Sequence, residues 1–330
     1  MTLRNSKVSV IMATFNGLPF IENQISSLIA QSKLPDELIV YDDASLDGTP
    51  EVIKAMSDAT PFPITLITGE KNKGVNGAFE AALSISSGDV VFFCDQDDLW
   101  HPEKIKKFME IFDTDPEVGL IFCDAVQIDK RNVALQKSLW DTVKFSTSRR
   151  NSFSRSPFES MLKGSNFIYG MASAFRQDCL SNFLPIEASS CGMTHDTWFS
   201  LHTLATGWRG IALNEKLVSY RRHENQTTKI ESKVSVFRQQ RLIDRQQRMA
   251  ATIDALQNVR ANVEKSTFVG YQGSHSRYIQ AISRKIDHLV LRESLRAKPT
   301  SSLTLKAVFS PGYWLYARGP VSVLRDIAKI

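Results

Sequence analysis

The stretch KVSVIMATFNGLPFIENQISSLIAQSKLPDELIVYDDAS, residues 7–45, carries two strand patterns separated by one helical pattern. Residues 7–13 form a short β-branched, apolar run, which is typical of a buried parallel strand. The turn-forming sequence TFNG follows, and apolar residues then recur at helical spacing from Ile21 to Ile29. Residues 36–43 form the second strand. The stretch therefore predicts a strand–helix–strand unit.

The same alternation continues for the next eighty residues. Further strands are predicted at 62–68, 88–95 and 118–129, and further helices at 75–85 and from Pro102 to about Asp113. Strands alternating with helices predict an α/β fold with a mostly parallel sheet covered by helices on both faces. In such a Rossmann-like sheet, ligands bind outside the carboxyl ends of the strands.

Polar residues follow three of these strands. The first, second and fourth strands end in ATFNG, YDDAS and CDQDD, so we expect three polar or acidic tips to converge on one crevice. Asp95, Asp97 and Asp98 repel one another unless a cation or hydrogen bonds offset the repulsion. A D-x-D pair suits Mg²⁺, which takes one or two carboxylates and completes its shell with phosphates and water. Alone, such a pair is also typical of a solvated turn.

The remainder of the chain divides into three parts. Residues 130–155 are polar and predict a mobile loop or an inserted hairpin. Ordered patterns return between 156 and 228, and amphipathic helices follow, one over Phe237–Leu256 and one over Ile279–Leu289. We therefore expect one domain over residues 1–228, with halves at about 1–129 and 156–228, and a basic helical C-terminal region over 229–330.

Composition and charge restrict the class of protein. The 330 residues are 42% hydrophobic and 23% charged, which is ordinary for a globular protein. The polar N-terminus predicts no secretory signal, no window has the length of a membrane span, and four scattered cysteines suit a reducing cytoplasm. Residues 221–330 hold 20 Lys/Arg against 8 Asp/Glu (+12), and residues 1–220 hold 20 against 27 (−7), giving the chain's +5. Exposed helices or an anionic partner would both explain the basic tail.

Several kinds of chemistry are excluded by their missing motifs. The first strand–helix turn has one glycine where dinucleotide-binding G-x-G-x-x-G needs three, and GEKNKGVNG lacks the ending of a P-loop. No G-x-S-x-G and no H-E-x-x-H motif occurs. Nucleic-acid binding is not expected, because aromatic residues interleaved with arginines are sparse in the tail.

The order of motifs resembles that of a known family. VSVIMATFNG, YDDASLDGT, NKGVNG and DQDDLWHPEKI, followed by HDTWFS and YRRHENQTT, are similar to the inverting family-2 glycosyltransferases of the GT-A fold. DQDDLWHPEKI is most similar to the bacterial rhamnosyltransferase-like branch. The resemblance covers roughly residues 5–228, and although each motif is loose, their shared order argues against chance.

The resemblance implies a role for each matching residue. A divalent metal, Mg²⁺ or Mn²⁺, would be held by Asp97 with His223, and Asp196 would be the general base. Asp98 is expected to cap the helix that Pro102 begins. The residues implied in binding the nucleotide sugar are Ala13, Phe15, Asn16, Asp42, Asp43, Lys73 and Asp95. Those implied in binding the acceptor are Gly170, His195 and Trp198.

Each of these roles has a structural alternative. Phe15 and Trp198 could be core aromatics, Lys73 a solvated lysine, and His223 a polar surface residue. Asp196 could cap the helix that starts beside it, and a cap can also serve as a base. Asp42 could belong to a turn instead of contacting the ribose.

Together these features predict an enzyme. The expected reaction transfers a sugar from a nucleoside-diphosphate donor, with dTDP-rhamnose suggested by the branch, to a hydroxyl of a glycan or lipid-linked acceptor in bacterial surface polysaccharide synthesis. The alternative is a non-catalytic sugar-nucleotide-binding module. A cytoplasmic protein is expected, with peripheral contact to the inner face of the membrane through the aromatic and basic C-terminal region. Packing of that region on the domain, or a homodimer contact, would also explain it.

Overall fold

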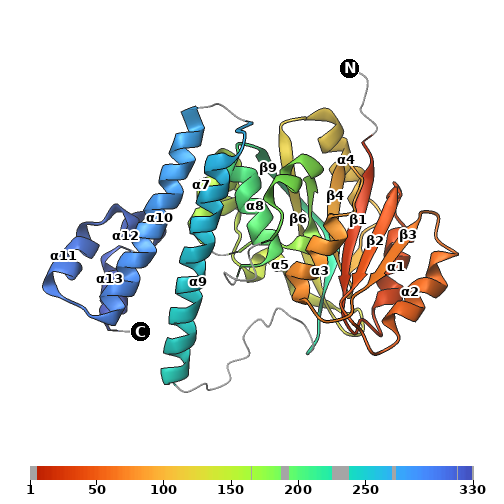
Figure 1. Cartoon of the computed structure of the whole chain (residues 1–330), viewed down its shortest axis with the longest axis horizontal. Helices are drawn as coiled ribbons and strands as arrows, with labels where there is room; N and C mark the ends of the chain where they lie inside the picture. Colours follow the sequence, from red (N-terminus) through yellow and green to blue (C-terminus); the bar gives the residue numbers. More distant parts are fainter. Residues whose placement is uncertain are drawn as a thin grey trace.

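The computed structural model describes residues 6–164, 166–186, 193–224, 238–269, 273–317 and 319–328. A mixed sheet with helices on both faces forms the body of the molecule (Figure 1). Its strands are β1 (Val8–Thr14), β2 (Glu37–Asp42), β3 (Ile64–Thr68), β4 (Val90–Asp95), β5 (Leu99–Trp100), β6 (Val118–Asp129), β7 (Ala134–Ser138), β8 (Ser173–Arg176) and β9 (Arg209–Arg222). Every strand predicted between residues 7 and 129 is present.

The order of strands is β3-β2-β1-β4-β8-β6-β9-β5, with β7 paired to β6. The pairs β3–β2, β2–β1 and β1–β4 are parallel, which confirms the predicted arrangement for the first half of the sheet. Beyond β4 the sheet is mixed, because β8 runs antiparallel to both β4 and β6 while β9 runs parallel to β6. Across the first half, Ala13 lies between Tyr41 and Asp95, so the ends of β2, β1 and β4 are level with one another.

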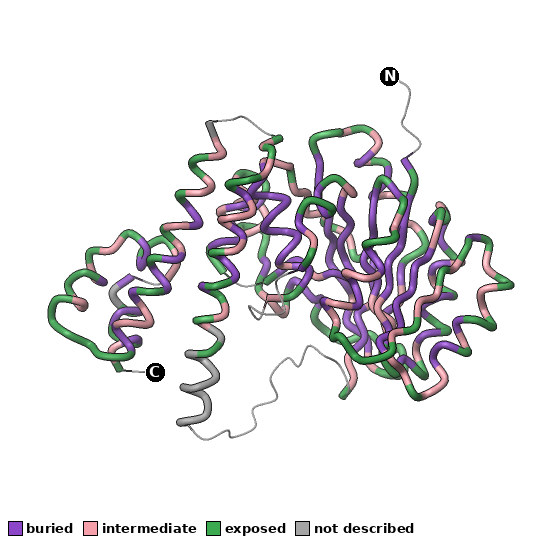
Figure 2. Tube along the Cα trace, in the orientation of Figure 1, coloured by how far each residue is buried: buried purple, intermediate pink, exposed green. Residues whose placement is uncertain are grey.

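Alternate residues of the central strands pack on two separate hydrophobic clusters, as the continuous apolar runs predict. Val10 and Phe92 belong to the cluster that includes Ile25 and Phe108, whereas Ile11 and Phe93 face the opposite layer. The strands are accordingly buried along most of their length (Figure 2). The helices of the first layer are α1 (Ile21–Ile29), α2 (Thr49–Ser57) and α4 (Lys104–Thr114), and those of the second include α3 (Gly74–Leu83), α7 (Pro157–Leu162) and α8 (His195–Ala205).

Residues 130–155 are ordered, so the prediction of a mobile loop is wrong and that of a hairpin is right. Strand β7 turns back on β6, and the helices α5 (Leu139–Thr142) and α6 (Thr147–Arg155) follow. Aromatic rings anchor this polar segment: Phe145 stacks on Phe167 with centroids 4.1 Å apart, and Phe153 meets Phe122 edge-on. A few buried aromatics therefore outweigh the polar composition of the segment.

The C-terminal region is helical, as predicted, although Phe237 lies outside the described residues. The first two of its helices pack on the body, because Ile253, Leu256 and Ile282 belong to the same hydrophobic cluster as the sheet. The last three surround a smaller cluster at Tyr313. None of the helices described is both long and apolar enough to cross a bilayer. The helices are α9 (Arg238–Lys265), α10 (Gly273–Ala297), α11 (Ser301–Phe309), α12 (Pro311–Tyr316) and α13 (Pro320–Ile327).

Candidate active site

A cavity of about 360 Å³ lies where the ends of β1, β2 and β4 meet. The 3-10 turn η1 (Gly170–Ala172) and the start of α8 complete its lining. The expected convergence of three strand ends is thus present, and it meets a further segment from the second half of the chain. The predicted site residues that line the cavity are Ala13, Phe15, Asp43, Asp95, Asp97, Gly170, His195 and Asp196.

Asp97 is held by the end of strand β9. His223 Nε2 lies 2.7 Å from Asp97 Oδ2, and the Arg221 guanidinium donates from Nε to the Asp97 carbonyl oxygen at 2.6 Å. The ring of Phe20 contacts both side chains, with its centroid 4.7 Å from the Arg221 guanidinium carbon and 4.9 Å from the His223 ring centroid. His223 and Asp97 are therefore hydrogen-bonded neighbours, of which Asp97 lines the cavity and the predicted metal ligand His223 does not.

The other two acids of the cluster are incompletely neutralised. Burial, together with the charges of Asp97 and Asp196, raises the pKa of Asp95 to about 7. Burial also raises the pKa of Asp98, whose Oδ1 accepts the Arg221 backbone N–H at 2.8 Å and whose Oδ2 has no partner among the described residues. The expected helix cap by Asp98 is wrong, because the residue at the start of α4 is Glu103 and Asp98 bonds β9 instead.

A buried lysine lies beneath this acidic cluster. Lys104 is fully buried, donates to the Met171 carbonyl oxygen at 2.6 Å, and places its ammonium 3.3 Å from the Trp100 ring centroid. Burial lowers the pKa of Lys104 to about 8, against the nearby carboxylates, which raise it. Lys104 therefore partly offsets Asp95 and Asp98 and ties α4 to η1.

This donor set fits a divalent cation that is completed by substrate. Among the residues that the structure describes, no three His, Cys, Asp or Glu side chains are grouped to hold a metal ion. Asp97 and His223 would supply two ligands, and Asp95 lies beside them. Two protein ligands suffice where diphosphate oxygens and water fill the remaining positions. The surplus carboxylates and the unpartnered Asp98 oxygen are the features that a cation would offset.

The opposite end of the cavity offers a ring and a carboxylate. Phe15 is 46% exposed and lines the cavity, so the core-aromatic alternative is excluded. Gln96, between the two acids of the D-x-D pair, accepts from the Phe15 N–H at 2.8 Å and donates to its carbonyl oxygen at 3.1 Å. Asp43 also lines the cavity, and its two oxygens accept the backbone N–H groups of Lys73 and Gly74 at 2.7 and 2.8 Å.

Three residues predicted to contact the nucleotide sugar do not line the cavity. Asp42 is fully buried and accepts from Thr14 Oγ1 and from Ser45, so the turn alternative is correct. Asn16 has a φ of 48° and accepts the Leu46 N–H, which also makes it a turn residue. The Lys73 ammonium lies 5.2 Å from the Tyr41 ring centroid. Lys73 contacts Asp43 through its backbone N–H, which donates to the carboxylate, and not through its side chain.

The two carboxylate oxygens of Asp196 have different surroundings. Oδ1 accepts from the Thr197 N–H at 2.6 Å and from the Thr194 hydroxyl, so it is used by the first turn of α8. Oδ2 has a single long contact, 3.3 Å, with the Gly170 N–H. Thr194 occupies the N-cap position of the helix. Asp196 therefore helps to order the helix start and keeps one oxygen with free acceptor capacity at the cavity.

His195 lies next to this carboxylate, pressed between Phe79 and Phe93 at centroid distances of 4.1 and 5.3 Å. Burial lowers the pKa of His195, so its ring is neutral, and neither ring nitrogen has a hydrogen-bond partner among the described residues. A Cβ at Gly170 would lie 2.6 Å from His195 Nε2, so only glycine allows this approach. Asn76 fixes the segment by accepting the His195 N–H and donating to the Met193 carbonyl oxygen.

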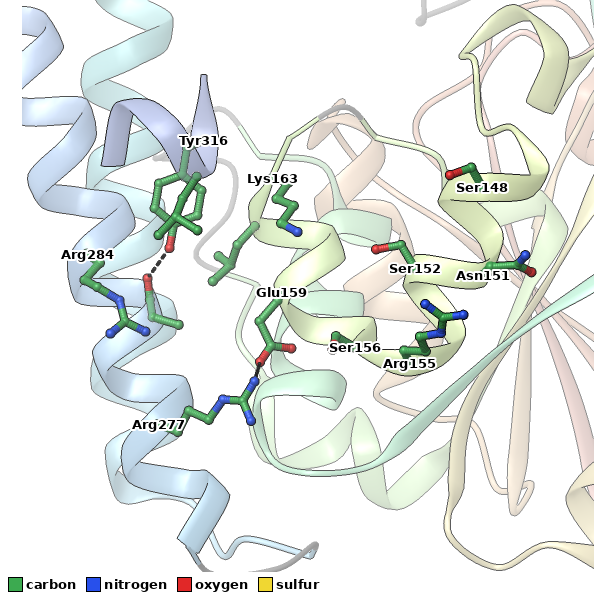
Figure 3. Close-up of a pocket in the computed structure, with 13 residues that line it drawn as sticks. Ser148, Asn151, Ser152, Arg155, Ser156, Glu159, Lys163, Arg277, Arg284 and Tyr316 are labelled. Carbon is green, nitrogen blue, oxygen red and sulfur yellow. Dashed lines mark hydrogen bonds and ion pairs between the residues drawn. The ribbon is translucent and has the colours of Figure 1, made fainter. Parts of the chain in front are cut away.

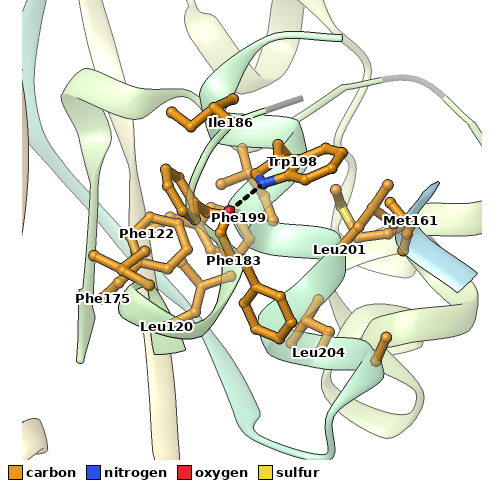
Figure 4. Packing of buried hydrophobic residues seen from close by; sticks show 14 of the residues in the cluster. Leu120, Phe122, Met161, Phe175, Phe183, Ile186, Trp198, Phe199, Leu201 and Leu204 are labelled. Carbon is orange, nitrogen blue, oxygen red and sulfur yellow. Dashed lines mark hydrogen bonds between the residues drawn. The ribbon is translucent and has the colours of Figure 1, made fainter. Parts of the chain in front are cut away.

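The prediction that Trp198 stacks on an acceptor sugar is wrong. Its side chain is fully buried, and its indole N–H donates to the Phe183 carbonyl oxygen at 3.1 Å (Figure 4). Trp198 occurs on α8 two residues after Asp196, and a helix rotates a residue at that spacing to another face. The core alternative accounts for this residue.

Four residues that shape the site were not predicted as such. Arg221 was quoted only as part of YRRHENQ, and Gln96 only as the middle of D-x-D, although strand alternation along β9 could have turned Arg221 inward. Asn76 belongs to the NKGVNG motif, but its bonds to Met193 and His195 have no local sequence signal. Lys104 carries no sequence signal, because a lysine at a helix start is typical of an exposed surface.

Comparison with known proteins assigns a family. The model of the family described as Glycosyl transferase family 2 matches residues 9–182. An uncharacterized glycosyltransferase of Nostoc sp., alr2836, is 35% identical over 115 residues, which are 35% of each chain. The UDP-Glc:alpha-D-GlcNAc-diphosphoundecaprenol beta-1,3-glucosyltransferase WfgD of Escherichia coli is 38% identical over 99 residues, or 30% of this chain and 38% of that protein. The chain spans between about a third and three fifths of the curated relatives that it matches.

Solved structures show the same fold at low identity. S. aureus TarS 1–349 in complex with UDP-GlcNAc superposes with a TM-score of 0.56 at 14% identity, covering 97% of this chain and 81% of that one. The mannosyltransferase PcManGT from Pyrobaculum calidifontis, in complex with GDP-Man and Mn²⁺, gives 0.50 at 17%, covering 98% and 86%. At these identities the likeness concerns the fold alone.

Proposed function

The chain belongs to glycosyl transferase family 2 and has the GT-A fold, and we propose that it transfers a sugar, with inversion, from a nucleoside-diphosphate donor to an acceptor hydroxyl. The observation that carries the proposal is the joint lining of one cavity by Asp97 and Asp196, which come from distant parts of the chain. The first is suited to the departing diphosphate and the second to the incoming hydroxyl.

The donor nucleotide would occupy the end of the cavity beside Phe15. The exposed Phe15 ring offers a stacking face, and the Asp43 carboxylate can accept from the imide N–H of uracil or thymine. Ala13 would approach the base through its backbone, and Asp95 would bond the ribose or the water shell of the metal. TarS, whose fold this chain shares, binds UDP-GlcNAc.

Asp97 and His223 would hold the divalent cation, Mg²⁺ or Mn²⁺. When bound, the cation neutralises charge on the diphosphate as it leaves. Arg221 keeps Asp97 in position through the backbone carbonyl, and Gln96 couples the same segment to Phe15. PcManGT, which has a similar fold, binds GDP-Man together with Mn²⁺, and this supports a metal-binding role for Asp97 and His223.

Asp196 would act as general base in a single displacement. The acceptor oxygen forms a bond to C1 of the donor sugar while the bond from C1 to the diphosphate oxygen breaks. The diphosphate leaves with the electron pair, and the hydroxyl proton passes to Asp196 Oδ2. That oxygen is suited to the task because, among the described residues, its only contact within hydrogen-bond range is the long one to the Gly170 N–H. The inverted anomer follows from attack opposite the leaving group.

The acceptor would lie against Gly170 and His195. The uncharged ring of His195, with both nitrogens unpartnered in the described structure, can donate to or accept from a sugar hydroxyl. A glycan or lipid-linked saccharide is proposed, since WfgD acts on a diphosphoundecaprenol-linked sugar and other relatives are named for succinoglycan and teichuronic acid biosynthesis. The proposal places transfer in residues 1–228, and assigns residues 229–330 to a peripheral contact with the inner face of the membrane.

A panel of nucleotide sugars tests the proposal. Diphosphate release is measured for UDP-, GDP- and dTDP-sugars, dTDP-rhamnose included, with Mg²⁺, Mn²⁺ or EDTA. We expect one donor class to turn over only with the cation. In Asp196→Asn, donor binding should persist and transfer should fall about 10²–10⁴-fold, because the proton has no acceptor.

The control is Asp178→Asn, an exposed carboxylate outside the cavity, which should turn over like the unaltered chain. Near-normal transfer by Asp196→Asn would remove the base assignment. Tight donor binding with no release for any acceptor would instead identify a non-catalytic sugar-nucleotide-binding module.

A further inference from the structure

A second hollow of about 760 Å³ lies away from the candidate active site, between the helices α6–α7 and the helices α10 and α12 (Figure 3). Four cationic side chains line it: Arg155 and Lys163 from the first pair, and Arg277 and Arg284 from α10. One carboxylate, Glu159, lies among them. We call this hollow the basic groove.

The positive charge of the basic groove exceeds what its own acid can neutralise. Glu159 pairs with Arg277 at 2.7 Å, which leaves three cations for one anion already in use. Arg155 and Lys163 form no ion pair with any described residue, and both are exposed. A groove of this sign attracts a ligand that carries phosphate or another anionic group.

An apolar surface begins at the wall of the same groove. Leu315 and Tyr316 of α12 line it, and α11–α13 carry further exposed apolar side chains. Six of the fifteen large apolar side chains exposed in the described part of the chain lie on these three short helices, whose outer turns are largely exposed in Figure 2. They are Leu305 (60%), Phe309 (78%), Trp314 (64%), Leu315 (48%), Val321 (52%) and Leu324 (67%).

The charges around this apolar surface have one sign. Residues 297–328 contain a single carboxylate, Asp326, and it is fully buried. The exposed charged side chains described on this segment are cations, Lys298, Lys306 and Arg325. Apolar and aromatic side chains rimmed by Lys and Arg are typical of a surface that lies in the interface of an anionic bilayer.

We propose that the basic groove and the apolar surface of α11–α13 form one membrane-docking face, which takes the phosphate of an anionic phospholipid in the groove while the apolar side chains enter the acyl boundary. The inference rests on the peripheral membrane contact of the proposed function and identifies its residues and lipid class. A second copy of the chain is the less suitable occupant, because a symmetric contact would bring these cations against one another.

Vesicle flotation of the full chain tests the proposal. We expect binding to phosphatidylcholine vesicles that contain phosphatidylglycerol, no binding to pure phosphatidylcholine, and release by high salt. Arg155→Glu with Lys163→Glu, and separately Phe309→Ser with Leu324→Ser, should each weaken binding about tenfold or more, since each removes one of the two contributions. The matched controls lie on the opposite side of the molecule: Lys54→Glu on α2 and Leu46→Ser, whose side chain is 95% exposed, should bind normally.

Three results would overturn the membrane-docking face. The first is that neither double variant weakens binding to anionic vesicles. The second is that the chain binds free inorganic pyrophosphate but does not bind vesicles. The third is a dimer in light scattering that Phe309→Ser with Leu324→Ser abolishes. Thermal melts verify that every variant is folded. Donor turnover with a water-soluble acceptor is measured on the same preparations and should not change, so failure of the docking face is distinct from failure of the proposed transfer.

Discussion

Carboxylates at two places, one after β4 and one on α13, are neutralised in opposite ways. After β4, Asp98 is buried and Asp95 and Asp97 are half-buried. Lys104 partly offsets Asp95 and Asp98, and Asp98 Oδ2 has no described partner. Arg221 and His223 contact Asp97. On α13, the single Asp326 accepts from Arg292 at 2.7 and 3.0 Å, from Arg296 at 2.7 Å and from the Tyr313 hydroxyl at 3.0 Å.

The pKa values of the two groups are shifted in opposite directions. Burial raises the pKa of Asp95 to about 7. Burial alone would also raise that of Asp326, but hydrogen bonds and charge from Arg292 and Arg296 outweigh it and hold the pKa below its usual value. A carboxylate that the fold satisfies is structural, whereas carboxylates that the fold leaves in excess are available to a ligand. The comparison separates acids of the same chemistry by what surrounds them.

The largest expected loss of stability is at Asp326. Asp326→Asn should lower the free energy of unfolding by about 3 kcal/mol, because Arg292 and Arg296 would lose their common counter-ion in a largely buried site. Urea titration measures this. Asp287→Asn, an exposed carboxylate on α10, is the control and should change stability by less than about 0.5 kcal/mol. A loss at Asp326 no larger than at Asp287 would contradict the structural role.

An effect of opposite sign is expected at Asp95, and it depends on pH. Its native pKa lies above the unfolded value of about 3.9, so the native state binds more protons between about pH 4 and 7 and stability falls as pH rises through that window. Asp95→Asn removes this slope, which is at most about 1.4 kcal/mol per pH unit. The free energy of unfolding of the variant should therefore rise relative to that of the unaltered chain between pH 4 and 7, and the difference should stay constant above pH 7. Thermal melts in EDTA measure this.

The pH dependence of Asp326 has the other sign. Its depressed native pKa contributes stability that is present above the unfolded pKa and is lost as pH falls below about 4. Asp326→Asn should therefore differ most from the unaltered chain at neutral pH and least in acid. If both variants gained stability relative to the parent as pH rises, or both lost it, the two groups would not be neutralised differently.

The sequence predicted the sheet because its signals are local. Continuous apolar strands, helical spacing and polar strand ends are enough to predict that Ala13, Asp43, Asp95 and Asp97 lie around one cavity. Asp42 and Trp198 were misassigned for a common reason. Their neighbours Asp43 and Asp196 face the cavity, and a single residue step along a strand end or two along a helix changes the face.

Other features depend on contacts between distant segments and left no local signal. Lys104 is buried only because β4, η1 and α4 meet around it, and Arg221 reaches Asp97 across 124 residues of sequence. In the same way, the C-terminal helices were predicted from their apolar stripes. Which of their side chains pack on the body, and which remain exposed on α11–α13, follows only from the folded arrangement.

Calorimetric binding of UDP and dTDP, with Mn²⁺ and with EDTA, tests most directly whether the β4 acids are held for a cation and a diphosphate. In the unaltered chain, Mn²⁺ should strengthen binding of the preferred nucleotide at least about tenfold, or about 1.4 kcal/mol. Asp97→Asn should abolish that gain, whereas Asp326→Asn should keep it. Equal affinity with Mn²⁺ and with EDTA in the unaltered chain would contradict the account.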